Sequence, residues 1–261
     1  MPEDILLTDL KDGVFSLTLN RPKANAFNDD LIEALKGGIK QAAKDPAARV
    51  VLLAATGKLF SAGQDVSALD DGGRVSFRKH LLKTYNPLIL QMRKLEKPVI
   101  AAINGAVAGA ALGIVLACDL RIASEKARFF VGFGGIGLAP DSAVSLMLPK
   151  LIGLGRAAEA AYANQPISAE QALEWGLVNR LVPADELAGA AREWAAELAR
   201  GPVHAMGFTK RTFNKAILPE LEAVLDYEAH VQEIAGRGRD HQEGLAAFLE
   251  KRDPDYTKTE D

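Results

Sequence analysis

Residues 97–123 read KPVIAAINGAVAGAALGIVLACDLRIA, and this stretch decides the class of fold. The short, continuous apolar run Pro98–Ile103 is typical of a strand that is buried on both faces. After Asn104-Gly105, the 13 residues from Ala106 to Cys118 are small or apolar, which predicts a closely packed helix. They are too few to span a bilayer, which takes about 20 residues. Asp119–Ala123 then indicates a second strand.

Strands and helices also alternate on the N-terminal side of this stretch. Asp12-Gly13 is a strong signal for the turn of a β-hairpin. We expect strands over Ile5–Leu10, Val14–Asn20 and Arg49–Ala55. We expect helices over Asp30–Lys44 and Arg74–Leu95, the second interrupted or entered afresh near Pro87.

The alternation continues on the C-terminal side and then stops. Ser168-Ala169-Glu170-Gln171 has the pattern of a capping box and predicts the start of a helix that ends at Gly176. From Asp185 to Arg252 the pattern is helical, with breaks at Pro202 and Pro219. Between these segments we expect a strand over Arg128–Val131, a glycine-rich loop over Gly132–Asp141, a helix over Ser142–Ile152 and a strand over Leu177–Val182.

This order of elements predicts an α/β core followed by a helical C-terminal region. The length of 261 residues favours one large domain with an appendage over two equal domains. We place the core at residues 1–195 and the helical region at residues 196–261.

The composition excludes several classes of protein. The net charge of −3 gives no basic field for nucleic acid or for an anionic membrane. Cys118 is the single cysteine, so no disulfide forms within the chain. The four histidines lack metal-binding spacing, and we expect no metal. The acidic start, Met1-Pro2-Glu3-Asp4, does not have the form of a secretory leader, and we expect a cytoplasmic protein.

Gly132-Phe133-Gly134-Gly135-Ile136-Gly137 matches the dinucleotide-binding pattern G-x-G-x-x-G. In such a fold the loop leads into a helix that holds a pyrophosphate at its N-terminus. Pro140 follows within three residues, where that helix would have to continue. We therefore interpret the glycines as a tight loop rather than as a nucleotide site.

Two loops can present backbone N–H groups to a ligand. Between Asn104 and Gly113 a strand ends and a helix of small residues begins, and the first N–H groups of a helix have no partner within it. The loop Ser61–Val66 is the second such place. From the spacing alone, a close-packed helix start and an ordinary turn explain the two loops at least as well.

Asp141 follows Pro140 and precedes an apolar helix, where it is most simply the N-cap residue of that helix. Its neighbours Leu138, Val144 and Leu146 are apolar. A carboxylate among them would be desolvated and have a raised pKa, which suits proton transfer. The pattern alone favours the cap and leaves the second interpretation open.

Taken together, several segments resemble the crotonase family, that is, the enoyl-CoA hydratase/isomerase superfamily. They cover nearly the whole chain in order: Leu19–Asn28, Phe60–Asp65, Lys97–Gly105, Ala117–Ala123, Ala172–Val182, and Glu243-Gly244 with Ala247–Arg252. The resemblance implies a crotonase-type core built as a spiral of ββα repeats. It also implies a C-terminal helical region that builds homotrimers, often paired into hexamers. The implied substrate is an acyl-CoA, with coenzyme A as part of the substrate and no separate cofactor.

By position in the resemblance, the backbone N–H groups of Gln64 and Ala110 form an oxyanion hole for the thioester. Preformed donors of this kind are worth about 3–4 kcal/mol each. Hydratases of the family use two glutamates, whose positions here hold Gly113 and Phe133, so the usual concerted hydration is not expected. Asp141 fills a different acid position of the family. In this the chain resembles the isomerases of phenylacetate degradation, which act on ring-1,2-epoxyphenylacetyl-CoA and shift enoyl-CoA double bonds.

The resemblance also implies contacts to CoA. Lys23 and Lys58 match positions near the nucleotide. The backbone around Ala62 and Val66 matches positions that meet the adenine. Two further matching residues, which reach the CoA of a neighbouring subunit, are Phe248 and Lys251.

Four functions stay open from the sequence. The first is acyl-CoA isomerisation with Asp141 as the single acid and base, and the second is a weak hydratase that uses the same residue. The third is a dehalogenase or hydrolase with Asp141 as nucleophile, although Asn86 stands where the family has a histidine. The last is a non-catalytic relative that binds acyl-CoA or RNA. The acyl pocket is expected between Leu69 and Leu90, where His80 and Tyr85 face either the acyl chain or solvent.

Overall fold

The computed structural model describes residues 4–22, 24–66 and 76–258. Its larger sheet has six strands in the order β1-β2-β3-β4-β6-β9. β1 pairs with β2 antiparallel, and the other neighbours pair in parallel. The bounds are Leu6–Lys11 (β1), Val14–Leu19 (β2), Val50–Ala55 (β3), Val99–Ile103 (β4), Leu120–Ser124 (β6) and Arg180–Val182 (β9). A smaller sheet joins β5 (Ala106–Ala108), β7 (Arg128–Phe130) and β8 (Ile167–Ser168).

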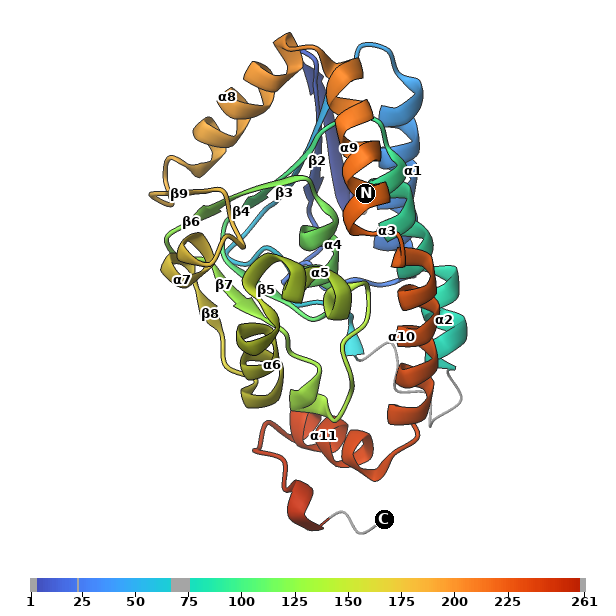
Figure 1. The fold of residues 1–261 in the computed structure, drawn as a ribbon. Coiled ribbons are helices and arrows are strands. Elements are labelled where there is room, and N and C mark those ends of the chain that lie inside the picture. The colour runs from blue at the N-terminus through green and yellow to red at the C-terminus, as the bar shows by residue number, and fades with distance from the viewer. Residues whose placement is uncertain (1–3, 23, 67–75, 259–261) are drawn as a thin grey trace.

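Both faces of the larger sheet are covered, which explains the continuous apolar run of β4. On one face, α8 (Leu187–Arg200) packs Trp194 against apolar side chains such as Val50 and Ile100. The other face carries the larger core, whose helices are α1 (Asp29–Lys44), α3 (Tyr85–Lys94) and α4 (Ala110–Ala117). Figure 1 shows α8 on one side of the sheet and α1 and α3 on the other.

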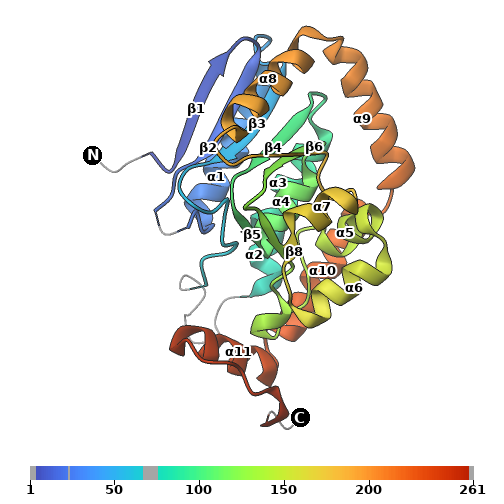
Figure 2. The same ribbon diagram turned by 90° about the vertical axis from the view of Figure 1, so that its left-hand side faces the viewer.

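The last two helices pack against earlier parts of the chain. α10 packs against α2 and α5, and α11 packs against a 3₁₀ turn at Gly134–Ile136. In Figures 1 and 2, α11 lies at the end of the molecule opposite to α8 and the start of α9. The bounds are Phe77–Lys83 (α2), Val144–Ile152 (α5), Leu154–Ala163 (α6), Ala169–Glu174 (α7), Val203–Ile217 (α9), Leu221–Ala235 (α10) and Arg239–Glu250 (α11).

The predicted α/β core with helices at its C-terminal end is confirmed. The capping box is confirmed as well, because Ser168 Oγ accepts the Gln171 N–H and Gln171 Oε1 accepts the Ser168 N–H. The division of the chain after residue 195 stays a prediction. Residue 195 itself lies within α8.

The predicted interruption of the helix over Arg74–Leu95 near Pro87 is confirmed, since a second helix begins at Tyr85, two residues before Pro87. Residues 74 and 75 lie outside the described residues, and the rest is split at Thr84. Thr84 has non-helical backbone angles, and its hydroxyl donates to His80 O at 2.6 Å. Pro87 lies in the first turn of α3, where a missing N–H breaks no helical hydrogen bond.

Other element boundaries differ from the predicted ones because strand pairing determines where these elements begin and end. Strand β5 separates Asn104-Gly105 from α4, because Ala106–Ala108 pairs with β7. The strand predicted over Leu177–Val182 is shorter, since only Arg180–Val182 reaches β6. α6 and β8 were not predicted. Within the described ranges, no helix combines the length and apolarity that crossing a membrane requires.

Candidate active site

Two loops run side by side where α4 begins. Ser61 forms a parallel bridge with Val107, and the Ala108 N–H donates to Ser61 O at 3.1 Å. A Cβ added to Gly63, whose φ is +88°, would lie 2.6 Å from Ala108 O and 3.7 Å from Ala110 N. The absence of a side chain at Gly63 therefore lets the loop with Gln64 approach the start of α4.

The backbone N–H groups of Gln64 and Ala110 are available to a ligand. Among the described residues, neither N–H has a hydrogen-bond acceptor. Ala110 is the first residue of α4, so its N–H lies at the positive end of the helix dipole. Gly109 precedes it with φ +56° and ψ −129°, a conformation that glycine adopts readily. An external oxygen atom can therefore bind at either N–H.

Asp141 is not the N-cap of α5, which corrects the simplest interpretation of the sequence. The helix begins at Val144, and Ser142 and Ala143 precede it with φ values of +54° and +65°. These two left-handed residues turn the chain, and the N–H groups at the start of α5 bind Glu228 instead. Asp141 is 7% exposed and lines an internal cavity.

The Asp141 carboxylate has two hydrogen-bond donors. Ser142 Oγ donates to Oδ1 and Gln232 Nε2 donates to Oδ2, both at 2.7 Å. Burial raises the pKa of Asp141 to about 6, although the two hydrogen bonds act in the opposite direction. The carboxylate is therefore mostly ionised at neutral pH and close enough to that pH to take up and release a proton.

The structure explains why position 113 holds no acid. A Cβ on Gly113 would lie 2.3 Å from Ser142 O and 2.6 Å from Ser142 Cβ. A glutamate at this position is therefore incompatible with the turn that follows Asp141. Phe133, at the other position that the resemblance matches to a hydratase acid, is buried and lines the cavity.

The side chain of Gln64 is held from α2 and α3. Tyr85 Oη donates to Gln64 Oε1 at 2.6 Å, and His80 Nε2 lies 3.3 Å from the same oxygen. Burial lowers the pKa of His80 and, with Asp141 nearby, raises the pKa of Tyr85 well above its ordinary value. Both side chains are therefore neutral at pH 7. They face the cavity rather than solvent.

One cavity of about 300 Å³ joins these groups. Of the residues suggested by the sequence, it is lined by Ala62, Gln64, Val66, Ala110, Asp141 and Phe248. Its apolar lining includes Phe77, Leu81, Phe133, Ile136, Leu138 and Leu245. The free N–H groups and the buried carboxylate thus share one largely apolar chamber.

Helix α11 closes one side of this chamber. His241 Nδ1 lies 2.8 Å from Ile136 O, and Tyr256 Oη donates to Gly135 O at 3.0 Å. A Cβ on Gly137 would lie 2.4 Å from the Asp240 carbonyl carbon. The glycine-rich loop is therefore a tight loop that receives α11, in agreement with the interpretation against a dinucleotide site.

The remaining residues suggested for CoA lie elsewhere. Lys58 lines a separate cavity of about 520 Å³ beside Arg21 and Ala24. Lys251 is exposed at the end of α11 and lines neither cavity. Lys23 and part of the expected acyl-pocket segment, residues 69–75, lie outside the described residues. Asn86 is buried, donates to Leu225 O at 2.9 Å and does not line the chamber.

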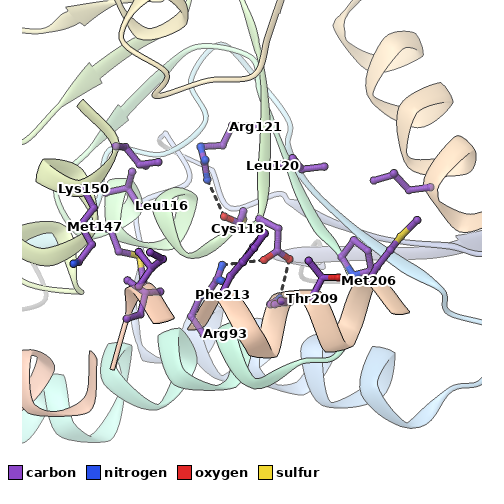
Figure 3. Close-up of a pocket in the computed structure, with 17 residues that line it drawn as sticks. Arg93, Leu116, Cys118, Leu120, Arg121, Met147, Lys150, Met206, Thr209 and Phe213 are labelled. Atoms are coloured by element: carbon purple, nitrogen blue, oxygen red, sulfur yellow. Dashed lines mark hydrogen bonds and ion pairs between the residues drawn. The ribbon is translucent and has the colours of Figure 1, made fainter. Parts of the chain in front are cut away.

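A larger cavity of about 600 Å³ lies between α9 and the core, and Figure 3 shows its lining. Asp119 pairs there with Arg93 at 2.9 Å and with Lys210 at 2.8 Å. Burial raises the pKa of the Cys118 thiol to about 12, so this cysteine is no nucleophile at neutral pH. The paired charges connect α9 to the core, and none of the candidate site residues lies in this cavity.

Gln232 and Glu228 of α10 were not predicted from the sequence. The buried face of α10 includes Leu221, Leu225 and Ala229, and both polar residues lie on it. Polar residues at positions where the helical period predicts burial are a signal that could have identified them. Among the described residues, no three His, Cys, Asp or Glu side chains gather as a metal site requires.

A buried carboxylate and two free N–H groups around one apolar chamber suit an enzyme that moves protons next to a carbonyl group. Comparison with known proteins gives the class. Residues 9–259 match the model of the enoyl-CoA hydratase/isomerase family, and the chain belongs to that family.

Individual relatives agree with this assignment. The chain is 38% identical over 258 residues to the 1,2-epoxyphenylacetyl-CoA isomerase of Escherichia coli, covering 97% of this chain and 98% of that one. It is 36% identical to a probable enoyl-CoA hydratase of Rhodobacter capsulatus, covering 95% and 96%. A crystal structure of an enoyl-CoA hydratase from Mycobacterium avium subsp. paratuberculosis superposes with a TM-score of 0.88 at 34% identity, covering 98% and 100%. The predicted family and crotonase fold are confirmed, and the names of the relatives include both reactions.

Proposed function

We propose that this protein is an acyl-CoA isomerase with Asp141 as its single acid and base. It moves a double bond of an enoyl-CoA or rearranges an epoxyphenylacetyl group. One observation carries the proposal: Asp141 is the only carboxylate among the described residues that line the chamber. A double-bond shift needs one group that removes a proton and returns it, whereas the family's usual hydration needs two acids.

The reaction can be written with this chain's residues alone. For a 3-enoyl-CoA, Asp141 takes the proton from C2, and the C–H electrons move into a dienolate whose charge lies on the thioester oxygen. The same carboxyl group then returns its proton to C4, and the double bond is left between C2 and C3. No atom is gained or lost, and no separate cofactor is required.

The backbone N–H groups of Gln64 and Ala110 would hold the thioester oxygen as its charge develops. Such donors stabilise the transition state by about 3–4 kcal/mol each because they are already in position before the reaction. Tyr85 and His80 support this role, since they bind the Gln64 side chain and limit its movement.

We propose that coenzyme A itself binds along Lys58 and the loop Ser61–Val66. Lys58 would supply positive charge for the phosphates beside Arg21, and the backbone at Ala62 and Val66, which line the chamber, would meet the adenine. Assembly into a homotrimer or a dimer of trimers, with Phe248 and Lys251 near a neighbour's CoA, and a cytoplasmic location stay predictions from the family resemblance.

Product analysis tests this function. Incubation with 3-hexenoyl-CoA in water enriched in ¹⁸O should give 2-hexenoyl-CoA of unchanged mass and no ¹⁸O in the protein. With 2-hexenoyl-CoA as the substrate instead, a product heavier by one water molecule would make the enzyme a hydratase. Incorporation of ¹⁸O into a peptide containing Asp141 during single turnover of a halogenated aroyl-CoA would make it a nucleophile instead. Bound CoA ester without product from the 2-enoyl, the 3-enoyl or the halogenated ester would favour the non-catalytic alternative.

A further inference from the structure

Glu228 is a second buried carboxylate close to Asp141, and the reaction above does not use it. It lies on α10, four residues before Gln232, and is 4% exposed. It does not line the chamber. Any effect of Glu228 on the reaction must therefore be transmitted through other residues.

Among the described residues, the hydrogen-bond partners of Glu228 all lie in the turn after Asp141 and at the start of α5. Its Oε2 accepts the Ala143 N–H at 2.7 Å, and its Oε1 accepts the Ser145 N–H at 3.1 Å. The Ser145 hydroxyl donates to Oε1 as well. A carboxylate from a distant helix thus takes the place of the missing N-cap of α5.

This turn needs support because its backbone is unfavourable. Ser142 and Ala143 both have positive φ, a conformation that side chains with a Cβ rarely adopt. Ala143 occupies the N-cap position of α5, and its methyl side chain cannot cap the helix. On the opposite side, Ser142 packs against Gly113 of α4. The turn is therefore held between α4 and α10, and both of its unfavourable residues directly follow Asp141.

We infer that Glu228 is a positioning residue that fixes the Asp141 carboxylate in the chamber by holding the Ser142–Ala143 turn. The inference rests on the proposed function, since it assumes that Asp141 moves the proton. It also means that the helical region after residue 195 completes the active site of its own chain, through Glu228 and Gln232, in addition to any role in assembly.

The chemistry of the side chain favours this role over that of a proton donor. Burial raises the pKa of Glu228 to about 7, and the negative charge of Asp141 acts in the same direction. The hydrogen bonds from Ala143 and Ser145 oppose this rise because they stabilise the ionised form. The donors to Glu228 come from Ala143 and Ser145, and neither of these residues lines the chamber.

The experiment compares Glu228→Ala and Glu228→Gln with Glu222→Gln, a matched control. Glu222 lies on the same helix, exposed and paired with Lys94 at 2.7 Å. For 3-hexenoyl-CoA, Glu228→Ala should lower kcat about 100-fold and leave KM within about threefold, because misplacement of a catalytic group affects chemistry more than binding. Glu228→Gln should lower kcat about tenfold. Its amide oxygen still accepts a hydrogen bond from the turn, but its NH₂ group meets the other backbone N–H, and two donors cannot form a hydrogen bond. Glu222→Gln should match the wild type.

Two further readouts separate positioning from general loss of structure. Amide hydrogen exchange at Ala143 and Ser145 should accelerate at least about tenfold in Glu228→Ala, while β3 and β4 keep their protection. Adding Ala143→Gly to Glu228→Ala should recover about tenfold in kcat, because glycine adopts a positive φ without strain. Ala143→Gly in the otherwise unchanged protein should not raise kcat.

The inference is overturned if folded Glu228→Ala keeps wild-type kcat, or if its loss of kcat only follows loss of protection throughout the core. Failure of the proposed function looks different. In that case Asp141→Asn keeps wild-type turnover, whatever the Glu228 variants do.

Discussion

Gln232 Nε2 donates a hydrogen bond of 2.7 Å to Asp141 Oδ2, and the two residues are 91 positions apart in the chain. This bond stabilises the ionised carboxylate in a site where burial favours the neutral one. Gln232 Oε1 is itself buried and has no partner among the described residues. Since a carboxylate oxygen can only accept, the amide must direct its NH₂ group toward Asp141.

Replacing Gln232 by methionine should shift the pH profile of the reaction. Methionine keeps the volume and removes the donor, so the pKa of Asp141 rises further. We expect the acid limb of kcat/KM to move upward by about one pH unit. Gln242→Met, an exposed change on α11, serves as the control. An unchanged limb would show that Gln232 does not act on the catalytic base.

In the wild type, the acid limb itself should lie near pH 6. The ionised carboxylate is the base that removes the first proton, and the pKa of Asp141 is about 6. At pH 5 about one molecule in ten is ionised, so kcat/KM should fall about tenfold between pH 8 and pH 5. A profile that stays flat down to pH 4.5 would mean that Asp141 is not the base.

The same burial makes Asp141 a cost to stability. Its pKa is raised from the ordinary 3.8 to about 6, so folding favours the protonated form. The contribution of the protonated Asp141 to folding stability is therefore complete below pH 3.8. About 3 kcal/mol of it is lost as the pH rises through 6. Asp141→Asn should therefore be inactive yet raise the melting temperature at pH 8, and the gain should shrink toward pH 4. The Gln232 amide can rotate to accept the new NH₂ group. A lower melting temperature at pH 8 would contradict this account.

Gly113 should not tolerate even a methyl group. A Cβ there meets Ser142 O at 2.3 Å, so Gly113→Ala must displace either α4 or the turn beside Asp141. We expect a loss of about 1–3 kcal/mol in unfolding free energy and a lower kcat. Gly37→Ala in α1 is the control, since nothing lies within 4 Å of its added Cβ and helix propensity should improve. Wild-type stability and turnover in Gly113→Ala would show that the turn has room to move.

Much of the fold follows from local patterns. The apolar run of β4, the Asp12-Gly13 hairpin and the Ser168 capping box each have a short-range cause, and each is present. Strand β5 was missed because three residues form a strand only by pairing with β7. The break near Pro87 was predicted to within three residues, because proline is tolerated in the first turn of a new helix.

The site was less predictable than the fold. Asp141 was identified as a candidate, but its pattern favoured a helix cap. The decisive features are the left-handed Ser142 and Ala143 and the polar partners from α10, none of which leaves a signal near residue 141. Contacts between segments about 90 residues apart depend on tertiary packing, and a single sequence contains no direct measure of it.

Hydrogen exchange into the substrate tests the central claim most directly. The protein is incubated with 3-hexenoyl-CoA in deuterated water, and the recovered ester is followed by NMR at C2 and C4. Wild type and Glu222→Gln should exchange deuterium at C2 and form 2-hexenoyl-CoA, whereas Asp141→Asn should be slower by at least about 100-fold with CoA ester binding retained. Wild-type exchange in Asp141→Asn would contradict the claim that Asp141 carries the proton.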